Sequence, residues 1–420
     1  MWDAASAREG GGGRRKPLDG EPHHPARQGL EEVAAGILGA IHERGTYRRM
    51  RTLRGAQAPR MEVEGKEVLL FAGSNYLDLA HHPSVVDAAA QAARDLGCAA
   101  AGSRLINGNL GVHEALEREL AEFLGTESAL TFSTGYMANL GVIPTLVGPG
   151  DAVVSDALNH ASIVDGCRLS RAALRVFPHA DLDGLAAVLA DVAGRARRIL
   201  VVVDGVYSMD GDLAPLAEIV RSAKGYGAMV MLDDAHGFGT LGARGRCTAE
   251  ELRVEHGVDV FVGTLGKALG SFGAFVAGPN VLRELLVNAA RSFIFTCALP
   301  PPQVAAARAA LQLVQAEPWR RERLASNAAR LRAKLAECGV STAPSKTHIV
   351  PVVVGESQAA MEVCEGLLAR GFYAQGIRHP SVAEGTARLR ITPMATHSSA
   401  EIDALASAVA EELARLPGHA

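Results

Sequence analysis

The chain has 420 residues, of which 48% are hydrophobic and 21% are charged, and its formal net charge is −4. This composition is ordinary for a globular protein with a sizeable core, and so small a net charge gives no argument for binding to nucleic acid or to a membrane surface. No segment approaches the ~18 consecutive apolar residues that a membrane-spanning helix needs. The first residues, Met1 to Asp3, lack a charged-then-apolar signal pattern, so we expect a cytoplasmic enzyme.

The cysteines and histidines do not suggest cross-links or bound metal. The six cysteines follow no CxxC spacing, and the histidines follow no HxxxH or HExxH spacing. We therefore expect free thiols in a reducing compartment and no metal site.

The N-terminal part of the chain falls into two segments. Residues 1–28 are rich in glycine and basic residues, a composition typical of a disordered tail. Residues 29–75 are predicted to be an N-terminal helical segment, because a helical pattern runs from Gly29 to about Arg54. Its apolar residues recur at steps of three and four and are Leu30, Val33, Ile37 and Ile41.

Residues 76–310 are predicted to form a large domain in which short apolar runs alternate with helical patterns. A helix is expected over His113–Leu124, where Gly125 is placed to cap its end, and another over Met137–Leu146. Short apolar runs without alternation indicate strands that are buried on both faces, in a mostly parallel sheet covered by helices. The expected strands are Ala129–Phe132, Ala152–Val154, Ile199–Val203, Met229–Leu232, Val260–Val262 and Phe272–Ala277.

Residues 311–420 are predicted to form a smaller C-terminal α+β domain. A long helix precedes an apolar strand at Ile349–Val354, and a second helix precedes short strands at Gly371–Tyr373 and Arg388–Ile391. Ser398–Glu401 has the pattern of a capping box and should open the final helix. The fold class is therefore α/β.

Lys267 and Asp233 carry the strongest chemical signal, since each follows an apolar strand. Ligands of such sheets bind beyond the carboxyl ends of the strands, where these residues and Asp204 are expected. A lysine amine, a carboxylate and the nearby Thr264 hydroxyl are what pyridoxal phosphate (PLP) requires: an imine partner, a partner for the ring nitrogen and a phosphate donor. Asp234 competes with Asp233, but successive side chains of a strand face opposite ways.

Further polar residues follow the same strands. Ser133, Thr134, Gly135 and Tyr136 join a strand to a helix whose first amides would cradle a phosphate. His236 is placed to contact the ring oxygen or the substrate, and Ser208 is a candidate hydrogen-bond donor near the ring. His160 either stacks on the ring or is incidental to a helix that Asn159 caps. Asp210 and Asp212 are expected to be turn formers.

Arg390 lies between apolar residues in a predicted strand, where an unpaired charge is costly. A substrate carboxylate that binds in a bidentate manner is one suitable partner, and a structural salt bridge is the alternative. Arg388 fits the salt-bridge description better.

With these residues assembled, the chain resembles the α-oxoamine synthases of the fold-type I PLP enzymes from about residue 30 to 415. The resemblance rests on separated motifs in a fixed order: Ser74–Leu77, Gly102–Arg104, Thr134–Tyr136, His160–Ser162, Ser208–Asp212, Asp233–Gly237, Gly263–Gly270 and Arg388–Pro393. It implies that residues 76–310 bind PLP. Two segments depart from the usual pattern: Ser74–Asp78 lacks an aspartate before the tyrosine, and Gly245-Arg246-Cys247 replaces Gly-Arg-Gly.

The resemblance also implies roles for individual residues. Lys267 would hold PLP and act with His160 and His236 in catalysis. Asp233 would pair with the ring nitrogen, while His236 and Ser208 would contact the ring oxygen. The phosphate would be held by Thr134, Gly135, Tyr136 and Thr264, and by Thr296 of the neighbouring subunit of a homodimer. Arg390 and Asn75 would bind the carboxylate of the amino acid.

The implied activity is condensation of a small amino acid, with alanine favoured, and an acyl thioester, with loss of CO2 and free thiol. The thioester would be an acyl-CoA or an acyl-carrier protein. A synthase of a specialised pathway that uses glycine or serine stays open, as do a PLP aminotransferase and a catalytically silent PLP-fold binding protein. The basic residues between Arg44 and Arg54 form either a solvated face or a contact with the thioester's phosphates.

Overall fold

The structure is a computed structural model that describes residues 29–416. The chain divides into two units, Met1–Arg49 and Met50–Ala420, which are described separately. The disordered tail predicted for residues 1–28 lies outside the described residues. Within the described residues, no helix combines the length and the apolar character that would let it cross a membrane.

The first unit contains one described helix, α1 (Leu30–Glu43), which is shorter than the sequence pattern suggested. It ends before Gly45, whose φ of 64° is incompatible with continuing the helix. The helical segment predicted for residues 29–75 is therefore wrong beyond Glu43. Residues 53–70 instead form strands β1 (Leu53–Arg54), β2 (Arg60–Val63) and β3 (Lys66–Leu70). Glu64 and Gly65 both have positive φ and close the tight turn between β2 and β3.

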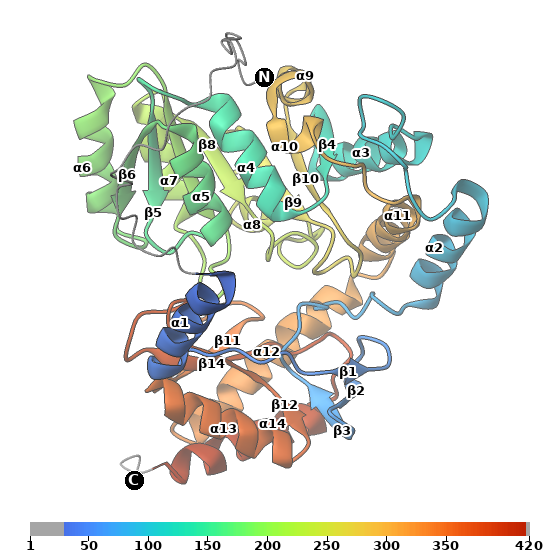
Figure 1. The fold of residues 1–420 in the computed structure, drawn as a ribbon, viewed down its shortest axis with the longest axis vertical. Helices are drawn as coiled ribbons and strands as arrows, with labels where there is room; N and C mark the ends of the chain where they lie inside the picture. The colour runs from blue at the N-terminus through green and yellow to red at the C-terminus, as the bar shows by residue number, and fades with distance from the viewer. Residues whose placement is uncertain (1–28, 417–420) are drawn as a thin grey trace, which may run out of the picture. The chain divides into compact units, whose positions relative to one another are not determined.

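A seven-stranded sheet forms the centre of the second unit (Figure 1). Its order is β4-β10-β9-β8-β7-β5-β6, and only β10 runs antiparallel to both of its neighbours within the described sheet. The mostly parallel sheet predicted from the sequence is thus confirmed. The strands are β4 (Ser128–Phe132), β5 (Ala152–Asp156), β6 (Ala173–Phe177), β7 (Ile199–Asp204), β8 (Met229–Asp233), β9 (Val260–Thr264) and β10 (Ala274–Gly278).

Both faces of this sheet are buried, and alternate residues of one strand enter different clusters. On β7, Val201 and Val203 pack with one cluster, whereas Leu200 and Val202 pack with another. The first cluster includes side chains of α3 (Gly111–Leu124), α6 (Leu182–Ala193), α7 (Leu216–Gly225) and α11 (Pro301–Ala316). The second includes α4 (Gly135–Leu146), α5 (Ala161–Ser170), α9 (Asn280–Ala289) and α10 (Arg291–Ile294). This double burial explains the short, continuous apolar runs.

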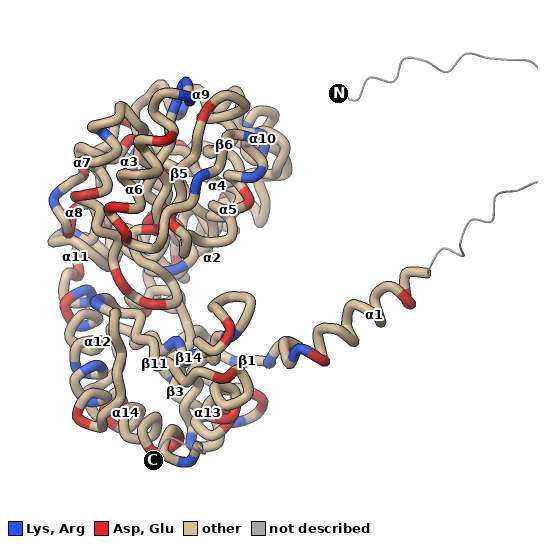
Figure 2. The backbone as a smooth tube through the Cα atoms, turned by 90° about the vertical axis from the view of Figure 1, so that its left-hand side faces the viewer, with Lys and Arg blue, Asp and Glu red and all other residues tan. Residues whose placement is uncertain are grey.

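Helix α3 ends at Leu124, as the sequence predicted. Gly125 caps α3 in the left-handed conformation, with φ of 77°. Two shorter elements lie between β8 and β9, α8 (Thr248–Glu251) and η1 (Glu255–Gly257), and α2 (Pro83–Leu96) precedes α3. Basic and acidic residues are interspersed along the chain (Figure 2), which agrees with its small net charge.

The C-terminal region has its own core and a three-stranded sheet of order β11-β14-β13. The long helix expected before β11 is two helices, because Pro318 interrupts it. The capping box of Ser398 and Glu401 is confirmed. The parallel pair of β3 and β12 joins residues 66–70 to this region. Its elements are α12 (Trp319–Glu337), β11 (Val350–Gly355), α13 (Ser357–Ala369), β12 (Phe372–Tyr373), β13 (Gln375–Ile377), β14 (Ala387–Ile391) and α14 (Ser399–Ala414).

Candidate active site

The polar residues of the site follow adjacent strands of the large sheet at its carboxyl edge. Asp204 at the end of β7 pairs in register with Asp233 at the end of β8. Asp233 in turn pairs with Val262 of β9, two residues before Thr264 and five before Lys267. Because parallel strands end at one edge, the alternation of strand and helix brings these distant residues together.

Lys267 contacts His236 directly. The lysine Nζ lies 2.9 Å from the imidazole Nε2. Burial lowers the pKa of Lys267, although Tyr76 and Asp233 act in the opposite direction. Burial and the neighbouring Lys267 hold the pKa of His236 well below its usual range. Both groups are therefore biased towards their neutral forms, in which each can exchange a proton.

Tyr76 extends this contact towards Arg390. Its hydroxyl lies 2.7 Å from Nδ1 of His236 and accepts a hydrogen bond of 3.2 Å from Nη2 of Arg390. If the lysine amine donates to Nε2, the ring proton is assigned to Nδ1 and is donated to the Tyr76 oxygen. Sequence reasoning missed Tyr76. Its only signal was its place beside Asn75 in the segment Ser74–Leu77.

Arg390 is 8% exposed and makes no ion pair within residues 29–416. Its Nε donates to the carbonyl of Ser208 at 2.5 Å. Arg388, two residues away, instead forms an ion pair with Asp210. The structural salt bridge therefore belongs to Arg388, whereas Arg390 has no acidic partner within residues 29–416.

Asp233 is buried and is held by neutral donors. Its Oδ2 accepts from Nδ2 of Asn139 at 2.7 Å and its Oδ1 accepts from the amide of Ala235 at 3.1 Å. No cation lies within ion-pair distance of it in the described part of the chain. Asp234 faces the other way and is bound by the amide and hydroxyl of Thr248. The expected division between the two aspartates is therefore confirmed.

Asn139 was also missed by sequence reasoning, although a polar residue in the apolar run of α4 was a usable signal. Its Oδ1 is buried and has no hydrogen-bond partner in the described residues. Its amide nitrogen also donates to Ser162 at 2.9 Å. Asn139 thus links the carboxylate of Asp233 to the start of α5.

His160 directly precedes α5 and is the residue at its N-cap. The expectation that Asn159 caps this helix is therefore wrong. Its amide donates to Asp204 at 2.8 Å and its Nδ1 lies 2.7 Å from the Ser162 hydroxyl. Although the ring is solvent-accessible, the surrounding protein atoms desolvate it and this lowers the pKa of His160. The side chain of Asn159 bonds to Ser155 and to the carbonyl of Val202 instead.

The predicted phosphate end is the N-terminus of α4. Thr134 caps the helix by accepting from the amide of Met137 at 3.1 Å. The amides of Gly135 and Tyr136 open a helix of 12 residues, whose dipole favours an anion. The Tyr136 hydroxyl bonds to Asp165, and the Thr264 hydroxyl donates to the carbonyl of Gly273 at 3.0 Å.

The amide of Asn75 is fully hydrogen-bonded within the protein. Its Oδ1 accepts from the amides of Leu79 and Ala80, and its Nδ2 donates to the carbonyl of Gln57 and to Asp78. These four bonds use the full capacity of its amide. These bonds shape the loop that carries Tyr76, and a contact between Asn75 and a substrate carboxylate stays a prediction.

The loop after β7 is held by side chains that were expected only to form turns. Asp212 accepts from His179 Nε2 at 2.8 Å, and the other ring nitrogen lies 3.0 Å from Asp156. Burial alone would lower the pKa of His179, but bonds to these two carboxylates raise it to about 10. The protonated ring thus anchors the segment that contains Ser208. The Ser208 hydroxyl makes no hydrogen bond within the described residues.

His348 lies behind Tyr76, with ring centroids 4.1 Å apart. Burial and the charge of Arg390 lower the pKa of His348 to about 3, so the ring is neutral at ordinary pH. Its Nε2 is buried and has no partner within residues 29–416. Sequence reasoning missed this residue, which precedes β11 by only two positions.

Comparison with known proteins finds one matching family and several similar enzymes. Residues 66–409 match the family described as aminotransferase class I and II. The chain is 52% identical over 378 residues to 8-amino-7-oxononanoate synthase of Geobacter sulfurreducens, covering 90% of this chain and 96% of that protein. It is 43% identical over 382 residues to the enzyme of the same name from Symbiobacterium thermophilum, covering 91% and 97%.

Two solved structures extend the comparison to the fold. Serine palmitoyltransferase from S. paucimobilis superposes with a TM-score of 0.86 at 35% identity, covering 92% of this chain and 98% of that chain. The 8-amino-7-oxononanoate synthase of Francisella tularensis superposes with a TM-score of 0.72 at 26% identity, covering 83% and 98%.

Proposed function

The chain belongs to the aminotransferase class I and II family and, within it, to the α-oxoamine synthases, and on this premise we propose that it is a PLP-dependent acyltransferase of the 8-amino-7-oxononanoate synthase type. The observation that carries the proposal is one connected set of groups at the sheet edge. Lys267, His236, Tyr76 and Arg390 are joined by contacts of 2.7 to 3.2 Å. This set supplies a base and an anion-binding group in adjoining positions.

The site residues fit PLP. Asp233 is a buried carboxylate without a cationic partner in the described chain, which suits the nitrogen of a pyridinium ring. The amides at the start of α4 suit its phosphate, and the Ser208 hydroxyl is available for a ring oxygen. Held at this site by Lys267 and Asp233, PLP would supply the electron withdrawal that acidifies the α-carbon of an amino acid substrate.

The chain's own groups then perform the proton and binding steps. Arg390 holds the carboxylate of the amino acid and so fixes which α-carbon bond faces Lys267. The Nζ of Lys267, once displaced by the substrate amine, accepts the α-proton, and burial favours its neutral form. His160 and His236 stabilise the negative charge that develops at the thioester oxygen.

The product name of the relatives defines the acyl substrate by carbon count. An 8-amino-7-oxo chain of nine carbons contains two carbons from alanine after loss of CO2. The remaining seven come from an acyl thioester with a free distal carboxylate, delivered on coenzyme A or on a carrier protein. The carbonyl carbon bonds to the alanine α-carbon, and the thiol leaves. We place this reaction in biotin biosynthesis.

The test uses the protein purified with PLP. Alanine and the seven-carbon thioester should release thiol and CO2 in equal amounts, measured with a thiol reagent and with labelled carboxyl carbon. A Lys267→Ala variant should lose the visible absorption band of the lysine-bound cofactor and at least about 1,000-fold in turnover, because it loses both the attachment and the base. A Lys224→Ala variant, which changes a surface lysine, should retain both. Thiol release by Lys267→Ala at the normal rate would refute the assignment.

A second candidate is a synthase that uses serine or glycine with another acyl chain, since the superposition on serine palmitoyltransferase is close. A screen of alanine, glycine and serine against thioesters of several lengths separates the two by kcat/KM. An aminotransferase would convert an amino acid and a keto acid without releasing thiol.

A homodimer is part of the proposal. Exposed apolar side chains gather on two loops joined by the hydrogen bond from Ala298 to the carbonyl of Gly102. Ile106 is 83% exposed and Phe295 is 71% exposed. Cys297 accepts a bond from Ser133, so these loops adjoin the phosphate end of the site. A contact between copies would cover them and bring Thr296 near a neighbouring phosphate. Light scattering after size-exclusion chromatography should give twice the chain mass.

A cytoplasmic location remains a prediction. It is supported by the six cysteines, all of which have free thiols in the structure.

A further inference from the structure

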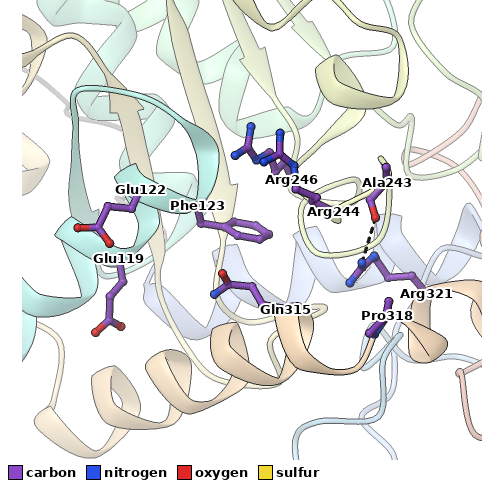
Figure 3. Close-up of a pocket in the computed structure, with 9 residues that line it drawn as sticks. All are labelled: Glu119, Glu122, Phe123, Ala243, Arg244, Arg246, Gln315, Pro318 and Arg321. Carbon is purple, nitrogen blue, oxygen red and sulfur yellow. Dashed lines mark hydrogen bonds between the residues drawn. The ribbon is translucent and has the colours of Figure 1, made fainter.

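A second cavity lies apart from the lysine site, between α3, the loop after residue 242 and the start of α12 (Figure 3). Its volume is about 500 Å³, which is within the usual range for small-molecule sites. None of the residues around Lys267 lines it. The lining residues are Glu119, Glu122, Phe123, Ala243, Arg244, Arg246, Gln315, Pro318 and Arg321.

Two of the arginines that line this cavity have no acidic partner within the described residues. Arg321 is 8% exposed and donates only to the carbonyls of Val314 and Ala243, the latter at 3.2 Å. The guanidinium of Arg246 makes no hydrogen bond or ion pair there, and its Nε is fully buried. Arg321 is a buried guanidinium without an anion, and Arg246 is half-buried with a buried Nε that has no partner. Because such groups are costly to leave unpaired, this arrangement favours binding of an anion.

The carboxylates in and beside the cavity form ion pairs with arginines other than Arg246 and Arg321. Glu119 is paired with Arg308 at 3.0 Å, and Glu122 lies 3.9 Å from Arg118. Glu250, just outside the lining, pairs with Arg244 at 3.3 Å and accepts the amide of Arg246. Figure 3 shows the arginines on one side and the glutamates on the other, with Phe123 and Gln315 between them.

The loop is shaped to admit the Arg321 side chain. Gly245 has φ of 79°, and a Cβ at this position would lie 2.7 Å from Cδ of Arg321. A larger residue would therefore displace the arginine. Gly245 and Arg246 belong to the segment that departs from the Gly-Arg-Gly pattern, and the proposed reaction gives them no role.

We propose that this cavity binds a small molecule through an oxyanion, a phosphate or carboxylate group held by Arg246 and Arg321. Guanidinium groups match such oxyanions through paired N–H donors. The body of the ligand would then lie against the Phe123 ring and the Gln315 amide. This site is separate from the cofactor's phosphate position at the start of α4.

The test measures binding of inorganic phosphate and of citrate to the PLP-loaded enzyme by calorimetry, at constant ionic strength set with chloride. The loaded cofactor occupies its own phosphate position. Saturable binding in the millimolar range or tighter is expected. Arg246→Gln should weaken it at least 10-fold, and this variant should fold normally because the guanidinium makes no hydrogen bond or ion pair within the described residues. Arg321→Gln should weaken it similarly.

Arg323→Gln is the matched control, since this arginine lies on the same helix, is exposed and lies outside the cavity. It should leave the affinity unchanged. The proposal is overturned if neither anion binds saturably, or if Arg246→Gln binds as tightly as the unaltered enzyme.

A kinetic measurement then identifies the molecule that carries the oxyanion. Only this part of the test rests on the proposed function. A raised KM for the acyl-CoA in Arg246→Gln, with kcat unchanged, identifies the phosphates of the substrate as the occupant. An unchanged KM together with lost phosphate binding identifies a separate ligand. Either result supports the oxyanion site. If the enzyme had no activity with a thioester, the calorimetric measurement of anion binding would still test the site.

Discussion

Arg388 and Arg390 lie two residues apart on the same face of β14, yet only Arg388 has an acidic partner within the described residues. Arg388 is paired with Asp210, whereas Arg390 bonds only to the uncharged Tyr76 and Ser208. Residues at this spacing point to the same side of a strand, so neither the backbone nor the local sequence distinguishes them. The loop after β7 does so by presenting a carboxylate to one and a carbonyl to the other.

Arg390→Gln should raise KM for the amino acid about 10- to 100-fold, the equivalent of about 1.5–3 kcal/mol for hydrogen bonds to a charged group. The matched variant Arg388→Gln should leave KM within about twofold and reduce stability by about 1–3 kcal/mol. Steady-state kinetics and urea unfolding measure the two effects. An unchanged KM in Arg390→Gln would place the carboxylate elsewhere.

Tyr76→Phe should lower kcat/KM about 10-fold and destabilise the protein by about 1–3 kcal/mol, because it leaves His236 and Arg390 without a common buried partner. The measurements are thiol release and denaturant unfolding. Tyr226 is 42% exposed, so Tyr226→Phe should change stability by less than about 0.5 kcal/mol. Equal effects of the two substitutions would show that the Tyr76 hydroxyl has no special role.

His179→Gln should destabilise the protein at pH 6 and matter less as the pH rises. The pKa of His179 is about 10 in the folded chain and about 6.5 when unfolded, so the folded state holds the proton more tightly. That stabilisation is complete below pH ~6.5 and is lost as the pH rises towards 10. We expect a deficit of about 2–4 kcal/mol at pH 6, smaller at pH 9.5.

Urea unfolding at both pH values measures this deficit. His256→Gln, at an exposed position, is the control. A deficit that does not change with pH would contradict the ion pairs that His179 makes with Asp156 and Asp212.

Acid should destabilise the protein through two histidines that are buried in their neutral form. Burial lowers the pKa of His348 to about 3 and the pKa of His397 to about 4. Below pH ~6.5 the unfolded chain takes up protons that the folded chain does not, so stability falls as the pH falls. Each histidine contributes at most about 1.4 kcal/mol per pH unit, and the contribution of His397 falls as the pH approaches 4.

His397→Asn should reduce the slope of stability against pH between 6 and 4.5 by about 1 kcal/mol per unit. Denaturant unfolding across a pH series measures the slope. The same slope in both proteins would mean that His397 titrates normally when folded.

Features that depend on neighbouring residues, such as strands and helix ends, were mostly predicted from the local sequence. The buried strands, the end of α3 at Gly125 and the capping box at Ser398 follow from residue spacing and side-chain chemistry. The positions of Asp233 and Lys267 beyond strands of a parallel sheet follow from topology. Alternation along the strand predicted that Asp233 and Asp234 face opposite ways, and their partners in the structure show which side each one faces.

The remaining features depend on contacts between distant parts of the chain. Tyr76 became a site residue only because β14 brings Arg390 to its hydroxyl. Asn75 has the same local motif, yet its amide is consumed by the adjoining loop. The end of α1 at Glu43 was missed because the basic residues between Arg44 and Arg54 were included in the helical pattern, although Gly45 leaves helical geometry.

The hydrogen bond between Tyr76 and Arg390 joins residues 314 positions apart, which is three quarters of the chain length. Loop closure over such a separation has a high entropic cost, and contacts of this kind form slowly. A ribosome must therefore release nearly the whole polypeptide before the contact between Tyr76 and Arg390 can form. On refolding from denaturant, helical signal should return before turnover, and chains cut short before residue 387 should never acquire it.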